Sequence, residues 1–408
     1  MKRRLLPIMM TLVLVCALPI WAAFVTSGDV TNPLVCTAGA TLPPEPEPVA
    51  VSNATDLQSR IADGKSVKLT DNIPITETLE IAKSLTLDLN GYVLKMTGTG
   101  SVIHITFAGP DVEVEITDGE PGREHTGEYA ALPAGGVITG GKAESGGGIL
   151  LDGGCTLKLT GGCITDCRAT DTGGGGVDLR GSTAILYISG TARIENCTAG
   201  EVWGANAIFN SGTMYADGGT VDGTVNNQGT IKHSNGVTDV TVFNEAVYNR
   251  AKKIIEAGIY KGTVENRGSI TGGTFYGGVT DDGGTIGDGA YETVKFNSDN
   301  GAQAKEEKVL RGQKVPNPAA PTKSGHTFTG WYLGDARYDF DTPVTAPLTL
   351  TARWEKVPST GGYYYYPTTD TKADDAKSSP KTADPGVALY AALSLLSLTG
   401  LTCTTKKR

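Results

Sequence analysis

The chain has 408 residues, of which 55 are glycine, and its formal net charge is −9 at pH 7. This length exceeds what one hydrophobic core usually supports, so we expect several folded units, and the glycine content favours turns and strands over helix. The negative charge repels polyanions, which argues against nucleic acid as a partner.

The N-terminus is typical of an exported protein. Residues 2–4 are basic and precede a long apolar run that ends at Ala23. This pattern predicts a secretory signal peptide over residues 1–23, cut after Ala22 or Ala23. The alternative is an uncleaved N-terminal membrane anchor, and both interpretations imply export.

A spacer and a short helix are predicted next. Residues 24–51 are rich in proline and glutamate, which favours an extended backbone without a core. The segment Asp56–Lys65 places Leu57, Ile61 and Ala62 on one side of a short helix.

Short strands are expected to follow this helix. Apolar and polar residues alternate between glycine, asparagine, aspartate or proline turns in five segments: Ser66–Leu69, Leu79–Ile81, Ser84–Leu89, Val102–Ile105 and Val112–Ile116. In the third segment every second residue is leucine, so one face of the strand should be buried and the other exposed to water.

The middle of the chain contains a repeat. The segment 146–167 is echoed by the segment 174–197, at an offset of roughly thirty residues. The matched pairs are Ile149 with Val177, Leu157 with Leu186, Ile164 with Ile194, and Cys167 with Cys197. Shorter echoes follow, which predicts narrower units. A repeat of this kind buries its apolar positions only when neighbouring units stack as coils of a β-solenoid.

The region 52–289 resembles in its architecture the right-handed parallel β-helix of pectin-lyase-like and bacterial adhesin-like proteins. The expected fold class is therefore mostly β: a right-handed parallel β-helix followed by a small β-grasp-like module, with helices in the terminal signal and anchor segments.

The chain has seven cysteines and no CxxC pair, which argues against a zinc site. If Cys167 and Cys197 occupy the same position on adjacent coils, their separation suits a disulfide. The alternative is an unbonded stack of small buried thiols.

A separate module is expected over residues 290–355. This stretch resembles the internalin-type B repeat, also called the Listeria/Bacteroides repeat, which implies a small β-grasp-like domain found in secreted and surface proteins. The residues that carry the resemblance are Val294, Phe296, Gly312, Pro318, Pro321, Gly325, Phe328, Gly330, Trp331, Tyr332, Tyr338, Phe340 and Trp354. Turn signals stand at Asn300-Gly301 and Pro321–Gly325, and the aromatic residues are expected to fill a small core.

The C-terminus predicts attachment to the cell envelope. Residues 356–379 have too few apolar residues for a core and are expected to form a disordered stem. The final segment 380–408 contains an apolar stretch, Val387–Cys403, that could span a membrane, followed by a basic tail at 406–408.

Before that stretch stand Ser379, Pro380, Lys381, Thr382 and Ala383. The three-part tail resembles a sortase sorting signal, whose pattern is Leu-Pro-x-Thr-Gly; serine replaces the leucine and alanine replaces the glycine. The resemblance implies that a sortase would cut after Thr382 and join it to peptidoglycan.

No catalytic constellation stands out, and no cofactor or metal site is expected. The acids near the repeat (Asp152, Asp166, Asp178, Glu195) and those near its end (Asp281, Asp282, Asp288) lie in turns or outward strand positions, where acids commonly serve solubility and local hydrogen bonding. The sequence therefore favours a surface adhesion or display protein with a glycan or protein ligand. The alternative is a lyase or glycoside hydrolase on the β-helix, whose activity would depend on acids such as Asp152 or Asp178.

Overall fold

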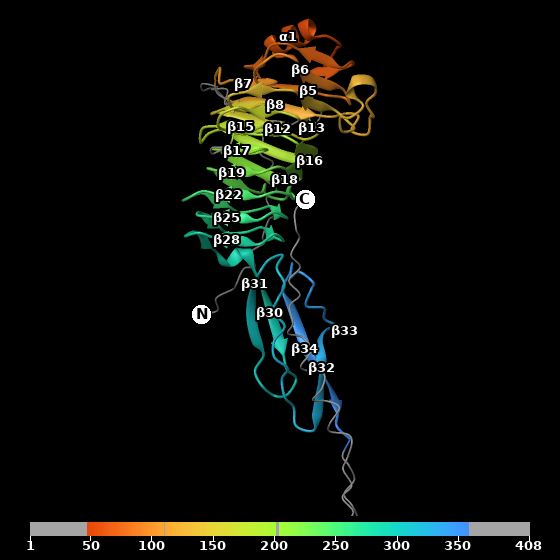
Figure 1. Ribbon diagram of the computed structural model, residues 1–408, viewed down its shortest axis with the longest axis vertical. Helices are drawn as coiled ribbons and strands as arrows, with labels where there is room; N and C mark the ends of the chain where they lie inside the picture. The colour runs from red at the N-terminus through yellow and green to blue at the C-terminus, as the bar shows by residue number, and fades with distance from the viewer. Residues whose placement is uncertain (1–46, 110, 201–203, 359–408) are drawn as a thin grey trace, which may run out of the picture.

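The computed structural model describes residues 47–109, 111–200 and 204–358. In this part the chain winds into a three-faced parallel β-solenoid, which is followed by one small mixed β-sheet (Figure 1). The expected fold class, mostly β with stacked parallel strands, is confirmed. The predicted terminal signal and anchor helices lie outside the described residues.

The first and second faces of the solenoid belong to one 18-stranded sheet, because two long strands run across both faces. These strands are β16 (Ile185–Glu195) and β18 (Thr213–Asp222). The first face also contains β1 (Val49–Val51), β2 (Val67–Leu69), β5 (Leu85–Asp88), β8 (Val112–Thr117), β12 (Cys155–Leu159), β20 (Thr230–Lys232), β23 (Ile254–Ile255), β26 (Ser269–Ile270) and β29 (Thr285–Ile286). The second face adds β3 (Ile73–Ile75), β6 (Val93–Met96), β9 (Val137–Thr139), β13 (Cys163–Thr165), β21 (Val242–Phe243), β24 (Ile259–Tyr260) and β27 (Thr274–Phe275).

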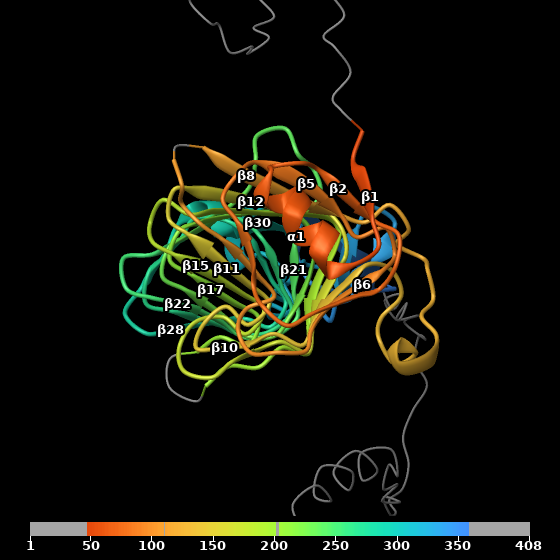
Figure 2. The same cartoon turned by 90° about the horizontal axis from the view of Figure 1, so that it is seen from above.

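The third face is a separate nine-stranded sheet, seen edge-on beside the other two faces in Figure 2. Its strands are β4 (Leu79–Ile81), β7 (Ile103–Ile105), β11 (Ile149–Asp152), β15 (Val177–Arg180), β17 (Ile208–Asn210), β19 (Val225–Asn227), β22 (Val247–Asn249), β25 (Val264–Asn266) and β28 (Val279–Asp281). A two-stranded arm, β10 (Lys142–Ala143) with β14 (Arg168–Ala169), stands at the corner between the second and third faces.

The register confirms the repeat read from the sequence. Ile149 pairs with Val177, Leu157 with Leu186 and Ile164 with Ile194, each on the next coil. The coils then shorten, as predicted. Ile149 and Val177 are 28 positions apart, whereas Val264 pairs with Val279 only 15 positions later.

The interior contains two ordered stacks that the short coils build. Phe243, Tyr260 and Phe275 stack ring on ring, with centroids 4.9 and 5.1 Å apart. A ladder of buried asparagines, which we call the asparagine ladder, consists of Asn210, Asn227, Asn249 and Asn266, linked by side-chain hydrogen bonds of 2.8 Å. Each coil turns directly after its asparagine. The asparagine side chain forms the hydrogen bonds that the buried backbone groups at this turn require, so the same residue recurs on each coil.

The N-terminal end of the solenoid is closed by α1 (Ala54–Ala62). Asn53 caps this helix by accepting a hydrogen bond from the Asp56 backbone nitrogen, and Leu57 and Ile61 are buried over the first coil. The helix and its two buried positions agree with the prediction. Ala62 does not: it is exposed, because it is the last helical residue and lies beyond the surface that α1 covers.

The second face carries a long loop on its outer surface. This loop contains the short helix η1 (Gly127–Tyr129), and its Tyr129 and Leu132 cover Val137 and Cys163. Asp118 holds the base of the loop through backbone hydrogen bonds from Gly91 and Gly136. Outward apolar residues on this face are thereby kept from water.

After η2 (Asp288–Ala290) the C-terminal module forms a five-stranded sheet in the order β31-β30-β34-β32-β33. The strands are β30 (Tyr291–Asn297), β31 (Lys305–Leu310), β32 (His326–Leu333), β33 (Ala336–Arg337) and β34 (Leu348–Lys356). Trp331 is 3% exposed and Trp354 packs partly buried against the same cluster, so both tryptophans serve the core, as expected.

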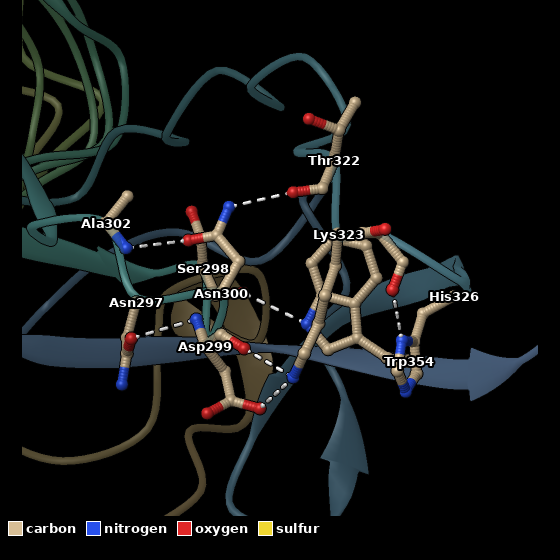
Figure 3. A network of polar contacts seen from close by, with 10 residues as sticks. Asn297, Ser298, Asp299, Asn300, Ala302, Thr322, Lys323, His326 and Trp354 are labelled. Carbon is tan, nitrogen blue, oxygen red and sulfur yellow. Dashed lines mark hydrogen bonds and ion pairs between the residues drawn. The ribbon is translucent and has the colours of Figure 1, made fainter.

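The two turns predicted in this module meet at its tip (Figure 3). Asn300 Nδ2 donates to the Thr322 carbonyl at 2.9 Å, and Lys323 Nζ donates to the Asp299 carbonyl at 2.6 Å. Trp354 Nε1 donates to the Ser298 carbonyl at 3.0 Å. These bonds fix the end of the sheet that lies farthest from the solenoid.

Candidate functional site

The third face presents one outward register position on five successive coils. Glu80, His104, Leu150, Asp178 and Phe209 occupy it in turn, each paired with the next. Their neighbours in each strand point into the core, because side chains alternate along a strand. At a strand spacing of about 4.8 Å, the row is roughly 19 Å long. Its first two side chains, Glu80 and His104, are polar, and apolar Leu150 and Phe209 then flank Asp178.

The arm turns this row into a groove. Glu144 and Ser145 follow β10 and stand beside the row, and together they line two adjoining hollows of about 400 Å³ and 350 Å³. The first hollow reaches Glu80 and His104, and the second reaches Phe209. We call this feature the arm groove. Hydroxyl groups of Thr78, Thr99, Ser101, Thr172 and Ser211 complete much of its lining.

His104 lies between two carboxylates. Its Nδ1 is 2.9 Å from Glu80 Oε2 and its Nε2 is 3.2 Å from Asp152 Oδ2. The contact with Asp152 does not have the geometry of a hydrogen bond. The three residues come from three successive coils of the third face, so the stacking of coils alone brings them together.

Asp178 is the buried acid of the arm groove and is 5% exposed. Ser145 Oγ donates a short hydrogen bond to Asp178 Oδ2, and Arg180 Nε lies 4.0 Å from the same oxygen. Burial raises the pKa of this carboxyl, while the Ser145 hydrogen bond and the Arg180 charge partly oppose the rise. The site therefore holds an acid whose protonated form is favoured by its surroundings.

The Asp178 pKa predicts a pH dependence of stability. Because the folded-state pKa lies above the usual 3.8, the folded protein holds this proton more tightly than the unfolded chain does. The contribution of this proton to folding stability is greatest below the pKa that Asp178 has in the unfolded chain. It is lost as the pH rises through the pKa that Asp178 has in the folded protein. We expect Asp178→Asn, which stays neutral, to gain stability relative to the wild type between pH 4 and pH 7 in denaturant titrations.

The control for this measurement is Asp166→Asn, since Asp166 is exposed and its φ of 53° is one that asparagine tolerates. Its stability relative to the wild type should change much less across the same interval. An Asp178→Asn difference that is equal at pH 4 and pH 7 would contradict the assignment.

The structure separates the acids that the sequence grouped. Asp178 lines the arm groove and Asp152 contacts His104 without lining either hollow, whereas Asp166 lies in an exposed turn and Glu195 points outward on the second face. Near the end of the solenoid, Asp281 accepts from Asn266 at 3.0 Å, Asp282 pairs with Arg267 and Asp288 pairs with Lys308. In the described parts of the chain no group of three or more metal-binding side chains is present.

Cys167 and Cys197 lie next to each other on adjacent coils, as the bridge between Arg168 and Thr198 requires. Both are buried free thiols, which is the unbonded alternative of the two arrangements expected from the sequence. Their contact and burial raise the pKa of Cys167 well above its usual range. Disulfide formation between them stays a prediction.

The sorting-signal residues Ser379, Pro380, Lys381, Thr382 and Ala383 lie outside the described residues, as does the apolar stretch after them. Within residues 47–358, apart from the short gaps, the chain contains no helix long and apolar enough to cross a membrane.

Comparison with known proteins finds a family match within the C-terminal module. Residues 293–353 match the Listeria-Bacteroides repeat domain family. Two proteins of Evansella cellulosilytica, described as a Gly-rich membrane protein and a membrane protein, are 39% and 37% identical to this chain over 67 residues. These matches cover 15% of this chain and only 8% and 10% of those proteins. No solved structure matches the chain.

Proposed function

We propose that this is a surface-associated display protein that binds glycan chains in the arm groove of its solenoid. The observation that carries the proposal is the continuous row from Glu80 to Phe209, lined on one side by the arm. Its mixture of apolar and polar side chains suits a sugar chain, which presents both apolar ring faces and hydroxyl edges. The repeat domain and the similarity to membrane proteins support a position at the cell surface.

A protein ligand fits this groove less well than a glycan does. Extended peptides gain much of their affinity by pairing with a free strand edge. The floor strands from β7 to β17 are each paired on both sides, so they offer a face and no edge, and the end strand β4 contacts α1.

The charge of the groove selects among glycans. The carboxylates of Glu80, Glu144 and Asp171 and the Asp178 carboxyl line its two hollows, together with the cationic side chains of Lys142 and Arg180. Like charges in a partly enclosed site disfavour an anionic ligand. Neutral or amine-bearing polysaccharides are therefore the proposed ligands, and uronate polymers are not.

Binding of the purified ectodomain to neutral, amine-bearing and uronate polysaccharides tests this function. We expect Phe209→Ala to weaken binding of the retained glycan roughly tenfold, because it removes the partly buried ring from the floor of the groove. The matched control is Lys232→Ala on the first face, which should bind like the wild type. Equal binding by both variants, or retention of uronate polymers alone, would contradict the proposal.

Glycan cleavage is the second candidate, and the buried Asp178 is the observation that favours it. A carboxyl with a raised pKa is suited to donate a proton to a leaving group. In the same assay, release of reducing or unsaturated sugar that Asp178→Asn abolishes would replace the binding function with a catalytic one.

Export and wall attachment complete the proposal. The signal segment 1–23 and the sorting residues 379–383 support secretion and transfer to peptidoglycan by a sortase, with the apolar stretch holding the chain in the membrane beforehand. Muramidase-released protein is expected to carry a wall peptide on Thr382. Mature protein that still ends at Arg408 would contradict the attachment.

A further inference from the structure

The C-terminal end of the solenoid has an open coil that must be covered. The last coil contains β27, β28 and β29, and a terminal parallel strand presents unpaired backbone groups and exposed core. Phe275 in β27 is the last ring of the aromatic stack, yet its side chain is 0% exposed. Something beyond the last coil therefore shields it.

The shield is a segment of the C-terminal module. The Phe275 backbone N–H donates to the Arg311 carbonyl at 2.7 Å, and Gln313 Nε2 donates to the Phe275 carbonyl. Gln313 also donates to the Tyr276 carbonyl at 3.2 Å, and Arg311 Nη1 donates to the Gly273 carbonyl at 3.4 Å. The Phe275 N–H is thus satisfied by a residue outside the solenoid, and its carbonyl accepts from Gln313 as well as from the Gly278 N–H of its own coil.

Gly312 allows this close approach. A Cβ at this position would lie 2.8 Å from the Phe275 backbone nitrogen and 3.0 Å from its carbonyl carbon. Its φ of +92° is also a conformation that side chains other than glycine rarely adopt. The Arg311–Gln313 segment can therefore lie flat on the last coil only with glycine at its centre.

Apolar and charged contacts hold the segment in place. Ala290 is fully buried in the hydrophobic cluster of the solenoid, and Tyr291 and Leu310 pack against the same cluster and not against that of the module. Arg311 Nε lies 2.6 Å from Glu292 Oε1, and the Glu292 residue is 7% exposed. This pair fixes the arginine whose backbone covers Phe275.

We propose that the repeat domain acts here as the C-terminal cap of the solenoid. Its interaction surface, consisting of Ala290, Tyr291 and residues 310–313, fits one kind of partner: the open end of a parallel β-coil. The module is therefore not an independent domain joined to the solenoid only by the chain. It completes the solenoid and prevents the last coil from pairing with another molecule. This role does not depend on the glycan proposal.

Hydrogen exchange of the whole ectodomain, combined with light scattering, tests the cap. Gly312→Val should lift the segment from the last coil, so the Phe275 amide, which donates to the Arg311 carbonyl, should exchange at least roughly tenfold faster and the protein should self-associate. Gln313→Ala, which requires no change of backbone, should accelerate exchange of the same amide if Gly312→Val fails to fold.

The control is Arg353→Ala, which removes an exposed pair with Asp335 in the module and should leave the last coil unchanged. Faster exchange confined to the last coil, with exchange in the β32 and β34 strands unchanged, is the expected result. Unaltered exchange at Phe275 in folded Gln313→Ala, and in Gly312→Val where it folds, would overturn the proposal.

Discussion

Replacing Asn227 by leucine is expected to cost at least about 3 kcal/mol of folding stability, because several buried groups lose their partners at once. Asn227 Nδ2 donates to Asn249 Oδ1 and to the Ile254 carbonyl, and its Oδ1 accepts from Asn210 and from the Gly229 backbone. Leucine has a similar size, so the loss comes from unsatisfied polar groups in the asparagine ladder and not from a cavity. Each such group costs about 1–3 kcal/mol.

The control for the ladder is Gln228→Ala, one residue later, where the side chain is partly exposed and does not enter the core. Its effect should lie within about 0.5 kcal/mol. Denaturant unfolding of both variants measures the contrast. Equal stabilities would mean that the ladder adds nothing beyond packing.

Gly175→Ala is expected to be about as damaging, with a loss of about 3 kcal/mol or more. A Cβ at Gly175 would lie 2.3 Å from the Thr198 carbonyl oxygen and 2.5 Å from the Asn206 carbonyl oxygen. These are backbone atoms of a neighbouring segment, so they cannot rotate away as a side chain would. The added methyl group must therefore push the coils apart.

Gly122→Ala is the matched control, since a Cβ there meets nothing within 4 Å and the residue has no left-handed backbone. Its thermal unfolding midpoint should stay near that of the wild type, while that of Gly175→Ala should fall by several degrees or more. If Gly175→Ala unfolds like the control, the coils are less tightly stacked than these contacts require.

The repeat in the sequence predicted the fold well where the coils are regular. The pairs Ile149 with Val177 and Leu157 with Leu186 fixed the register, because equal spacing puts equal side chains on one face. The strand β3 was not predicted, since Pro74 stands at its centre and proline usually argues against a strand. It is tolerated because β3 is the first strand of the second face and pairs on one side only, with β6.

The candidate site was harder to predict because the coils that form it differ in length. Leu79 pairs with Ile103 after 24 positions, but Ile103 pairs with Ile149 only after 46, because the long loop on the second face intervenes. No fixed period therefore connects Glu80 and His104 with Asp178. The sequence singled out Asp152 and Asp178 as acids, but only Asp178 lines the groove, and its contact with Ser145 depends on the arm, whose two strands have only two residues each.

The module also determines how a pulling force would enter the protein. The described chain leaves the sheet after β34, which runs parallel to β30, and β30 begins at the junction with the solenoid. A pull on the chain beyond Lys356, resisted by a ligand held on the solenoid, would drag these two neighbouring strands in opposite directions along their length. The backbone hydrogen bonds between β30 and β34 would then be loaded together in shear, and they would not break one after another. This arrangement lets the sheet resist tension along the long axis of the molecule.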